Sequence, residues 1–302
     1  FEKMPQIWNS LLSLLIYHNN VQTNKISVIM KARVYYLLFL LLFATNSMAD
    51  INSISDNQYE CIYEFKINNG NPPEVYSTIL TFNENSSFFS DYSIYLIDSL
   101  LQVQHLEEEY ESVKNLMRKK EYFFDQTITL NLADREYLVC GSITPDNYYY
   151  IEEASKISWN LTDESDTICG YLCEKAIGEY GGRSWSVWYT SQIPAMYGPW
   201  KLCGVPGLVL KAEDADGIFV FEAISFRKSS VAMPPLNTDK HIKTTREKFI
   251  RQKNNFEKNP VGNISFESIG SINIDKQGKG SVLIDGQQLR FHPNGYVPLE
   301  KQ

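Results

Sequence analysis

Histidines are few in this sequence and lie apart from the hydroxyl and thiol groups that they would have to activate. The chain has 4 histidines, and the three beyond residue 50 are His105, His241 and His292, in expected helices or the tail. Serine and cysteine nucleophiles need a histidine base held against them, and no Gly-x-Ser-x-Gly turn is present. We therefore predict no catalytic residue, and the sequence favours a protein that is not an enzyme.

Two short patterns begin like metal sites, and neither is complete. Cys169 and Cys173 have the spacing of two zinc ligands, but no further cysteine or histidine lies close enough along the chain to complete the set. An Asp-x-Asp-Gly segment at residues 214–217 begins like a calcium loop, but Ser225 stands where an EF-hand carries glutamate. We predict a turn at residues 214–217, no metal site and no cofactor.

The cysteines allow disulfides without selecting them. They are Cys61, Cys140, Cys169, Cys173 and Cys203. Because five is odd, at least one thiol is left over or pairs between chains. An oxidising compartment would permit disulfides, and the sequence leaves their pairing open.

An aromatic-rich stretch is the candidate for ligand binding. Its members are Trp185, Trp188, Tyr189, Tyr197 and Trp200. Such rings can stack on sugars or line an apolar ligand pocket. They can equally pack a sheet against its core, because large aromatic side chains favour strands. Both interpretations stay open.

The same stretch carries turn-forming residues at close intervals, namely Pro194, Gly198, Pro199, Gly204, Pro206 and Gly207. Pro206 followed by Gly207 is the chemistry of a type II turn, which predicts a positive φ at Gly207. Lys201 is the one charged residue between positions 188 and 210. We therefore interpret this motif as architectural and expect alanine at Thr190, Ser191 or Lys201 to leave the fold intact.

The order of these residues resembles the signature of the GLPGLI family, also called the Porph_ging family, of exported bacterial proteins. The similar segments are residues 188–190, 197–201 and 204–210, with residues 182–183 upstream and 296–300 near the tail. The family has no established biochemical activity. The resemblance therefore implies an exported protein and assigns it no reaction.

The N-terminal part has the features of an export signal. Lys31 and Arg33 precede an apolar run at residues 34–44, and residues 47–49 form a small-x-small cleavage site. The run is shorter than the roughly 20 apolar residues that span a bilayer. We expect a non-native upstream extension over 1–29, a signal peptide over 30–49, a β-rich domain over 50–258 and a partly flexible C-terminal extension over 259–302.

Strand-like and turn-like segments alternate through most of the chain. Expected strands cover residues 59–68, 75–82, 87–93, 122–130, 136–143, 148–152, 157–161, 175–180, 183–189, 208–212 and 218–226, with helices over 94–120 and 241–258 and a hairpin over 280–291. Their spacing favours an antiparallel meander over βαβ units. The expected fold class is α+β and β-rich, a curved antiparallel sheet or half-barrel with one or two helices packed on it.

The charge of the chain bears on its partners. It carries 28 Lys and Arg against 36 Asp and Glu, a net charge of −8. Nucleic-acid binding therefore lacks its basic stripe, and an anionic membrane surface is an equally poor partner. We expect a periplasmic or secreted binding protein for a small apolar or envelope-related ligand, not an integral membrane protein after signal removal. The alternatives are an interaction module that binds a cell-envelope protein and a carboxylate-dependent hydrolase.

Overall fold

The computed structural model describes residues 58–70, 72–96, 124–144, 146–229, 232–258, 269–274, 280–284, 287–291 and 295–301. All of them belong to one compact unit, Ser55–Gln302. The expected leader over residues 1–49 lies outside the described residues, as does nearly all of the helix expected over 94–120. No helix in the described ranges is long and apolar enough to cross a membrane.

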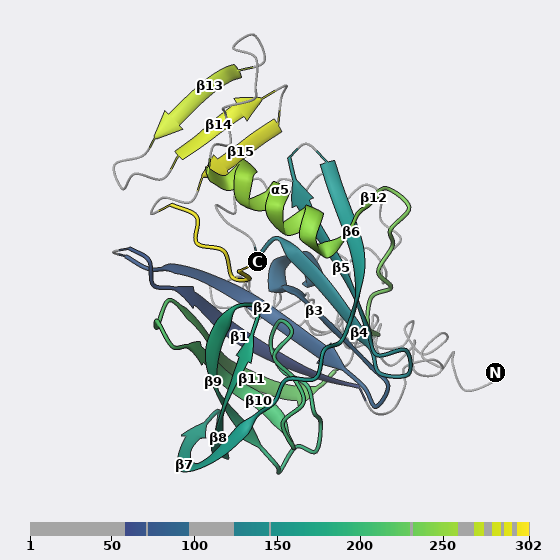
Figure 1. The fold of residues 1–302 in the computed structure, drawn as a ribbon, viewed down its shortest axis with the longest axis vertical. Coiled ribbons are helices and arrows are strands. Elements are labelled where there is room, and N and C mark those ends of the chain that lie inside the picture. The colour runs from purple at the N-terminus through teal and green to yellow at the C-terminus, as the bar shows by residue number, and fades with distance from the viewer. Residues whose placement is uncertain are drawn as a thin grey trace, which may run out of the picture. The chain divides into compact units, whose positions relative to one another are not determined.

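Twelve strands form one large open sheet in the described part of the chain (Figure 1). They are β1 (Tyr59–Ile67), β2 (Glu74–Phe82), β3 (Ser86–Asp91), β4 (Gln126–Asn131), β5 (Glu136–Ile143), β6 (Asp146–Glu153), β7 (Asn160–Ile168), β8 (Tyr171–Tyr180), β9 (Arg183–Thr190), β10 (Leu208–Asp214), β11 (Phe219–Lys228) and β12 (Ile242–Lys243). Their order is β12-β6-β5-β4-β3-β2-β1-β11-β10-β9-β8-β7. Only β12 pairs in parallel, with β6. The β-rich, mostly antiparallel fold is thus confirmed.

The β8–β9 hairpin shows how the sequence sets the two faces of the sheet. Gly181 and Gly182 have φ of 60° and 75°, as a two-residue type I′ turn requires. Along β9, buried and half-buried residues alternate, because successive side chains point to opposite faces. Trp185 therefore lies in the core, whereas Trp188 lies on the other face.

The acidic strand β7 is where the structure departs most from the expected strands. A strand was expected over 157–161, and β7 instead covers Asn160–Ile168, including Asp163, Glu164 and Asp166. Acidic residues are poor strand formers in general. At an edge, however, charged side chains protect the unpaired backbone from further pairing, so this sequence suits the outermost strand.

A helix, α5 (Arg246–Lys258), packs on strands β5 and β6. Its Phe249 ring lies 5.5 Å from the ring of Tyr150 and covers Gly141, where a Cβ atom would lie 2.6 Å from it. The helix begins later than the expected residue 241 because Thr245 caps it, accepting a hydrogen bond from the Lys248 amide.

A second sheet contains β13 (Ile269–Ile274), β14 (Gly280–Ile284) and β15 (Gln287–Phe291). The last two strands pair antiparallel, which confirms the hairpin expected over residues 280–291. Strand β13 was not expected.

Candidate functional site

The connection between β9 and β10, residues 191–207, packs its backbone directly against neighbouring strands. A Cβ atom at Gly198 would lie 1.9 Å from the Leu202 carbonyl oxygen and 2.9 Å from Val209 Cβ. No side chain fits at that position. The glycine at this position therefore allows the connection to pack closely against Val209.

The type II turn expected at Pro206–Gly207 is wrong. Gly207 has no positive φ, and the positive value of 95° belongs to Gly204. The Gly207 amide instead donates to the Val205 carbonyl at 2.8 Å, which makes a tight three-residue turn around Pro206. Glycine is needed at position 207 because a Cβ there would lie 2.2 Å from the Thr190 carbonyl oxygen.

A strained turn directs Lys201 into the protein. Trp200 has a φ of 55°, which is uncommon for a residue other than glycine. The turn is closed by the Leu202 amide, which donates to the Pro199 carbonyl at 3.1 Å. Strain of this kind costs on the order of 1–3 kcal/mol and persists only where the surroundings enforce it. At Trp200, the contacts that the next residue, Lys201, makes inside the protein hold the strained backbone in place.

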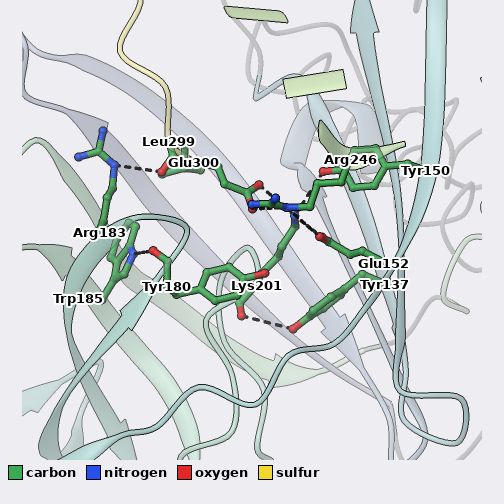
Figure 2. Close-up of polar contacts among 10 residues, drawn as sticks. All are labelled: Tyr137, Tyr150, Glu152, Tyr180, Arg183, Trp185, Lys201, Arg246, Leu299 and Glu300. Atoms are coloured by element: carbon green, nitrogen blue, oxygen red, sulfur yellow. Dashed lines mark hydrogen bonds and ion pairs between the residues drawn. The ribbon is translucent and has the colours of Figure 1, made fainter. Parts of the chain in front are cut away.

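Lys201 is a buried cation among carboxylate and phenol groups (Figure 2). Its Nζ lies 3.2 Å from Glu300 Oε2, donates to the Tyr150 hydroxyl at 3.3 Å and forms a further ion pair with Glu152. The ammonium also lies 5.6 Å from the centre of the Trp200 ring, within cation–π range.

Arg246, at the start of α5, completes this group of charges. Its Nε lies 3.1 Å from Glu152 Oε2, and its Nη2 lies 2.5 Å from Glu300 Oε1. We call Glu152, Lys201, Arg246 and Glu300 the charge cluster. It balances two cations against two carboxylates and joins strand β6, the β9–β10 connection, helix α5 and the C-terminal segment.

Burial perturbs the ionisable groups of this region. It raises the pKa of Glu152 above its usual range, although Lys201 and Arg246 oppose the shift. Burial also raises the pKa of Tyr150 and Tyr137 well above the ordinary value. Both phenols therefore stay protonated at neutral pH and act as neutral hydrogen-bonding groups.

Arg183 holds the backbone of the C-terminal segment next to the charge cluster. Its Nε donates to the Leu299 carbonyl at 3.0 Å, and its Nη2 donates to the Pro298 carbonyl at 2.7 Å. The same guanidinium pairs with Asp214 at 2.8 Å. Residues 298–301 lie against the β8–β9 turn, where the Lys301 amide donates to the Gly181 carbonyl at 2.7 Å.

The five aromatic candidates divide between the core and the opposite face. Four of them are buried, namely Trp185, Tyr189, Tyr197 and Trp200. Trp188 is half-buried, and its ring lies 5.4 Å from Lys175 Nζ and 5.1 Å from Lys211 Nζ. The structure therefore does not bring all five together on one surface, and their role in binding stays a prediction.

Sequence reasoning missed the charge cluster. The contacts of Lys201 argue against the expectation that alanine there leaves the fold intact, because its loss would leave Glu152 and Glu300 with Arg246 as their remaining partner in the cluster. A signal was present, since Lys201 is the only charge in an otherwise apolar motif. Glu152, Arg246 and Glu300 carried no such signal, because charged residues surround each of them in the sequence.

The five cysteines are free thiols. Cys203 Sγ lies 3.0 Å from the Tyr137 hydroxyl, and Cys169 is the only exposed one of the five. In the described ranges, no three His, Cys, Asp or Glu side chains gather so that they could hold a metal ion.

The charge cluster is built to hold segments together. Lys201 and Glu300 are sealed from solvent, and every carboxylate has a cationic partner. The other two members, Glu152 and Arg246, have side chains 11% and 28% exposed. The arrangement therefore fastens the C-terminal segment and α5 to the sheet.

Residues 98–255 match the family described as N-glycanase peptide, N-terminal domain. The match covers more than half of the 302-residue chain. The chain belongs to this family. The matched range includes Glu152, Lys201 and Arg246, whereas Glu300 lies beyond it.

Solved structures of PNGF-II are similar to this member of the N-glycanase N-terminal domain family. In one crystal form the TM-score is 0.46 at 18% identity, over 74% of this chain and 36% of the PNGF-II chain. In another it is 0.45 at 19% identity, over 65% and 32%. The chain thus spans about a third of the PNGF-II chains. Similarity at this level supports no argument about activity. No curated protein matches the chain.

The family match corrects two expectations. The resemblance to the GLPGLI family is wrong, because the chain matches the N-glycanase N-terminal domain family instead. The close-packed glycines at 198 and 207 explain why the motif looked similar. Glycine marks places where backbones approach closely in many sheets, so a short Gly and Pro pattern can recur in unrelated proteins. The expectation of a binding protein for an apolar or envelope-related ligand, with its two alternatives, is contradicted by the same match.

Proposed function

We propose that this chain serves N-glycan processing as the N-terminal domain of an N-glycanase-type protein, and that its part is to recognise the glycoprotein. The observation that carries this proposal is the family match over residues 98–255. The charge cluster supports recognition over bond cleavage, because both of its carboxylates are paired with Lys201 and Arg246.

The face of the sheet that carries Trp188 offers the chemistry that a glycan needs. Neighbouring strands bring Lys175, Trp188, Lys211 and Glu222 into one row across β8, β9, β10 and β11. An indole ring stacks on the apolar face of a sugar, and charged side chains hydrogen-bond its hydroxyl groups. The two lysines are long and flexible, so they can shift away from the ring when a sugar approaches.

Two further proposals accompany this role. The export signal over residues 30–49 suits a protein that meets glycoproteins outside the cytoplasm. The second is that the sheet curves as a half-barrel with α5 on its concave side. It is supported by Tyr137 of β5, whose hydroxyl donates to the carbonyl of Lys201 in the β9–β10 connection. Five strands separate β5 from β10 in the sheet order.

Binding of a defined N-glycopeptide to the full chain tests the proposal. We expect tryptophan fluorescence to change on titration with the glycopeptide and not with the same peptide after glycan removal. Trp188→Ala should weaken binding by about tenfold or more, given roughly 1.4 kcal/mol for each factor of ten. Leu132→Ala, an exposed apolar residue outside this row, should leave binding unchanged. Equal binding of both peptides, or none, would refute the proposal.

A further inference from the structure

The C-terminal segment, residues 298–301, is held as a bound peptide would be. Arg183 donates to the carbonyls of Pro298 and Leu299, and the Gly181 carbonyl accepts from the Lys301 amide at 2.7 Å. The last of these bonds joins two main-chain groups, as when a peptide adds to the margin of a sheet, whereas the first two come from the guanidinium of Arg183. Together these bonds fix the direction and register of the segment.

The side chain of Glu300 adds specificity to these backbone contacts. Its two carboxylate oxygens are bound separately, Oε2 by Lys201 Nζ at 3.2 Å and Oε1 by Arg246 Nη2 at 2.5 Å. The carboxylate is 6% exposed. Charge-assisted hydrogen bonds are roughly twice as strong as neutral ones, so a residue without a carboxylate would fit this position poorly.

The surface under the segment fits it closely. A Cβ at Gly182 would lie 2.8 Å from Lys301 Cβ, and one at Gly181 would lie 3.2 Å from Glu300 Cγ. Arg183 is held by Asp214 at 2.8 Å and stacks over the Phe219 ring at 4.6 Å. Neither of these two contacts involves the segment.

We propose that the Gly181–Gly182 turn, Arg183, Lys201 and Arg246 form a recognition site for a Pro-Leu-Glu peptide, which the chain's own residues 298–301 occupy. This proposal goes beyond the glycan role and does not depend on it. Without Glu300, Lys201 and Arg246 would face Glu152 alone, and the site would carry a net positive charge. It would then attract an acidic peptide from another source.

A separate peptide must compete with the segment, because the segment belongs to the same chain as the site. Intramolecular attachment gives such a segment an effective concentration of up to the order of millimolar. The site therefore becomes available to a second peptide when the chain's own segment is weakened.

A labelled peptide with the sequence of residues 296–302 tests the site. The receptor is the full chain with Pro298→Gly, Leu299→Ser and Glu300→Ser, checked for its fold by circular dichroism. Fluorescence anisotropy should show the peptide binding this variant about tenfold or more tighter than the wild-type chain. A peptide with Gln in place of the glutamate should bind about tenfold more weakly. Lys228→Ala, an exposed lysine outside both proposed sites, is added to the receptor as a control and should change nothing.

A folded receptor that does not bind the peptide at concentrations of about 1 mM would overturn the proposal. If the receptor does not fold, hydrogen exchange on the wild-type chain decides. The Lys301 amide should be protected, and excess peptide should speed its exchange by displacing the segment. Exchange at the rate of a free peptide would equally overturn it, and so would unchanged exchange with peptide well above the roughly millimolar effective concentration of the segment.

Discussion

Two lysine–glutamate pairs in this protein have similar lengths and opposite surroundings. Lys201 and Glu300 lie 3.2 Å apart with side chains 0% and 6% exposed. Lys175 and Glu164 lie 2.9 Å apart with side chains 16% and 65% exposed. The first pair joins the β9–β10 connection to the C-terminal segment, and the second joins neighbouring strands at the β7 edge. The comparison teaches that burial and connectivity, more than distance, decide what such a pair does.

The largest expected difference is between the alanine variants of the two lysines. Lys201→Ala leaves Glu152 and Glu300 buried with one cation fewer, and losing one partner of a buried pair costs about 3–5 kcal/mol. Lys175→Ala breaks a pair whose glutamate is largely exposed, and should cost less than about 1 kcal/mol. Urea denaturation of both variants measures the difference. Equal losses would show that burial does not separate the two pairs.

The next prediction isolates the contact between the β8–β9 turn and the C-terminal segment. Gly182 and Gly170 have φ of 75° and 81°, so alanine is strained at both, by about 1–2 kcal/mol. A Cβ at Gly170 meets nothing within 4 Å, whereas one at Gly182 meets Lys301. Gly182→Ala should therefore cost about 1–3 kcal/mol more, as overpacking does. Thermal unfolding compares them, and matching losses would mean that the segment does not press on the turn.

The smallest expected effect is a pH dependence due to Glu152. Because burial raises the pKa of this carboxyl in the folded protein, the folded state holds its proton more tightly than the unfolded state. The stability that it contributes is fully present below the unfolded pKa, near 4.3, and is lost as pH rises through the folded pKa. Wild-type stability should therefore fall relative to Glu152→Gln over that window. Denaturation curves at several pH values measure this, and wild-type stability that rises relative to Glu152→Gln as pH rises would contradict the assigned direction.

Much of the fold could be predicted from the sequence, because strand signals are local. The alternation along β9 and the glycine pair at 181–182 indicate a hairpin directly, and the expected strand over 136–143 matches β5. The edge strand β7 was mostly missed, because its acidic residues oppose strand propensity and only its position at the edge accounts for them.

The charge cluster could not be predicted in the same way. Lys201 and Glu300 are 99 residues apart in sequence, and nothing local in the sequence relates them. The fold brings them together through the packing of the β9–β10 connection and through Arg183. Similarly, the sequence predicted a type II turn at Gly207. Glycine is required there because the Thr190 carbonyl lies too close for a side chain, and such a contact between separate segments cannot be predicted from local sequence.

The account rests on Glu300 being fastened by Lys201, and a double-mutant cycle between these two residues tests it most directly. Lys201→Ala, Glu300→Ala and the double variant are unfolded in urea beside the same cycle for Lys175 and Glu164. We predict a coupling of about 1.5 kcal/mol or more for the buried pair, within the range of contacting residues, and about 0.5 kcal/mol or less for the exposed pair. A coupling at Lys201–Glu300 no larger than at Lys175–Glu164 would contradict the claim that the charge cluster holds the C-terminal segment.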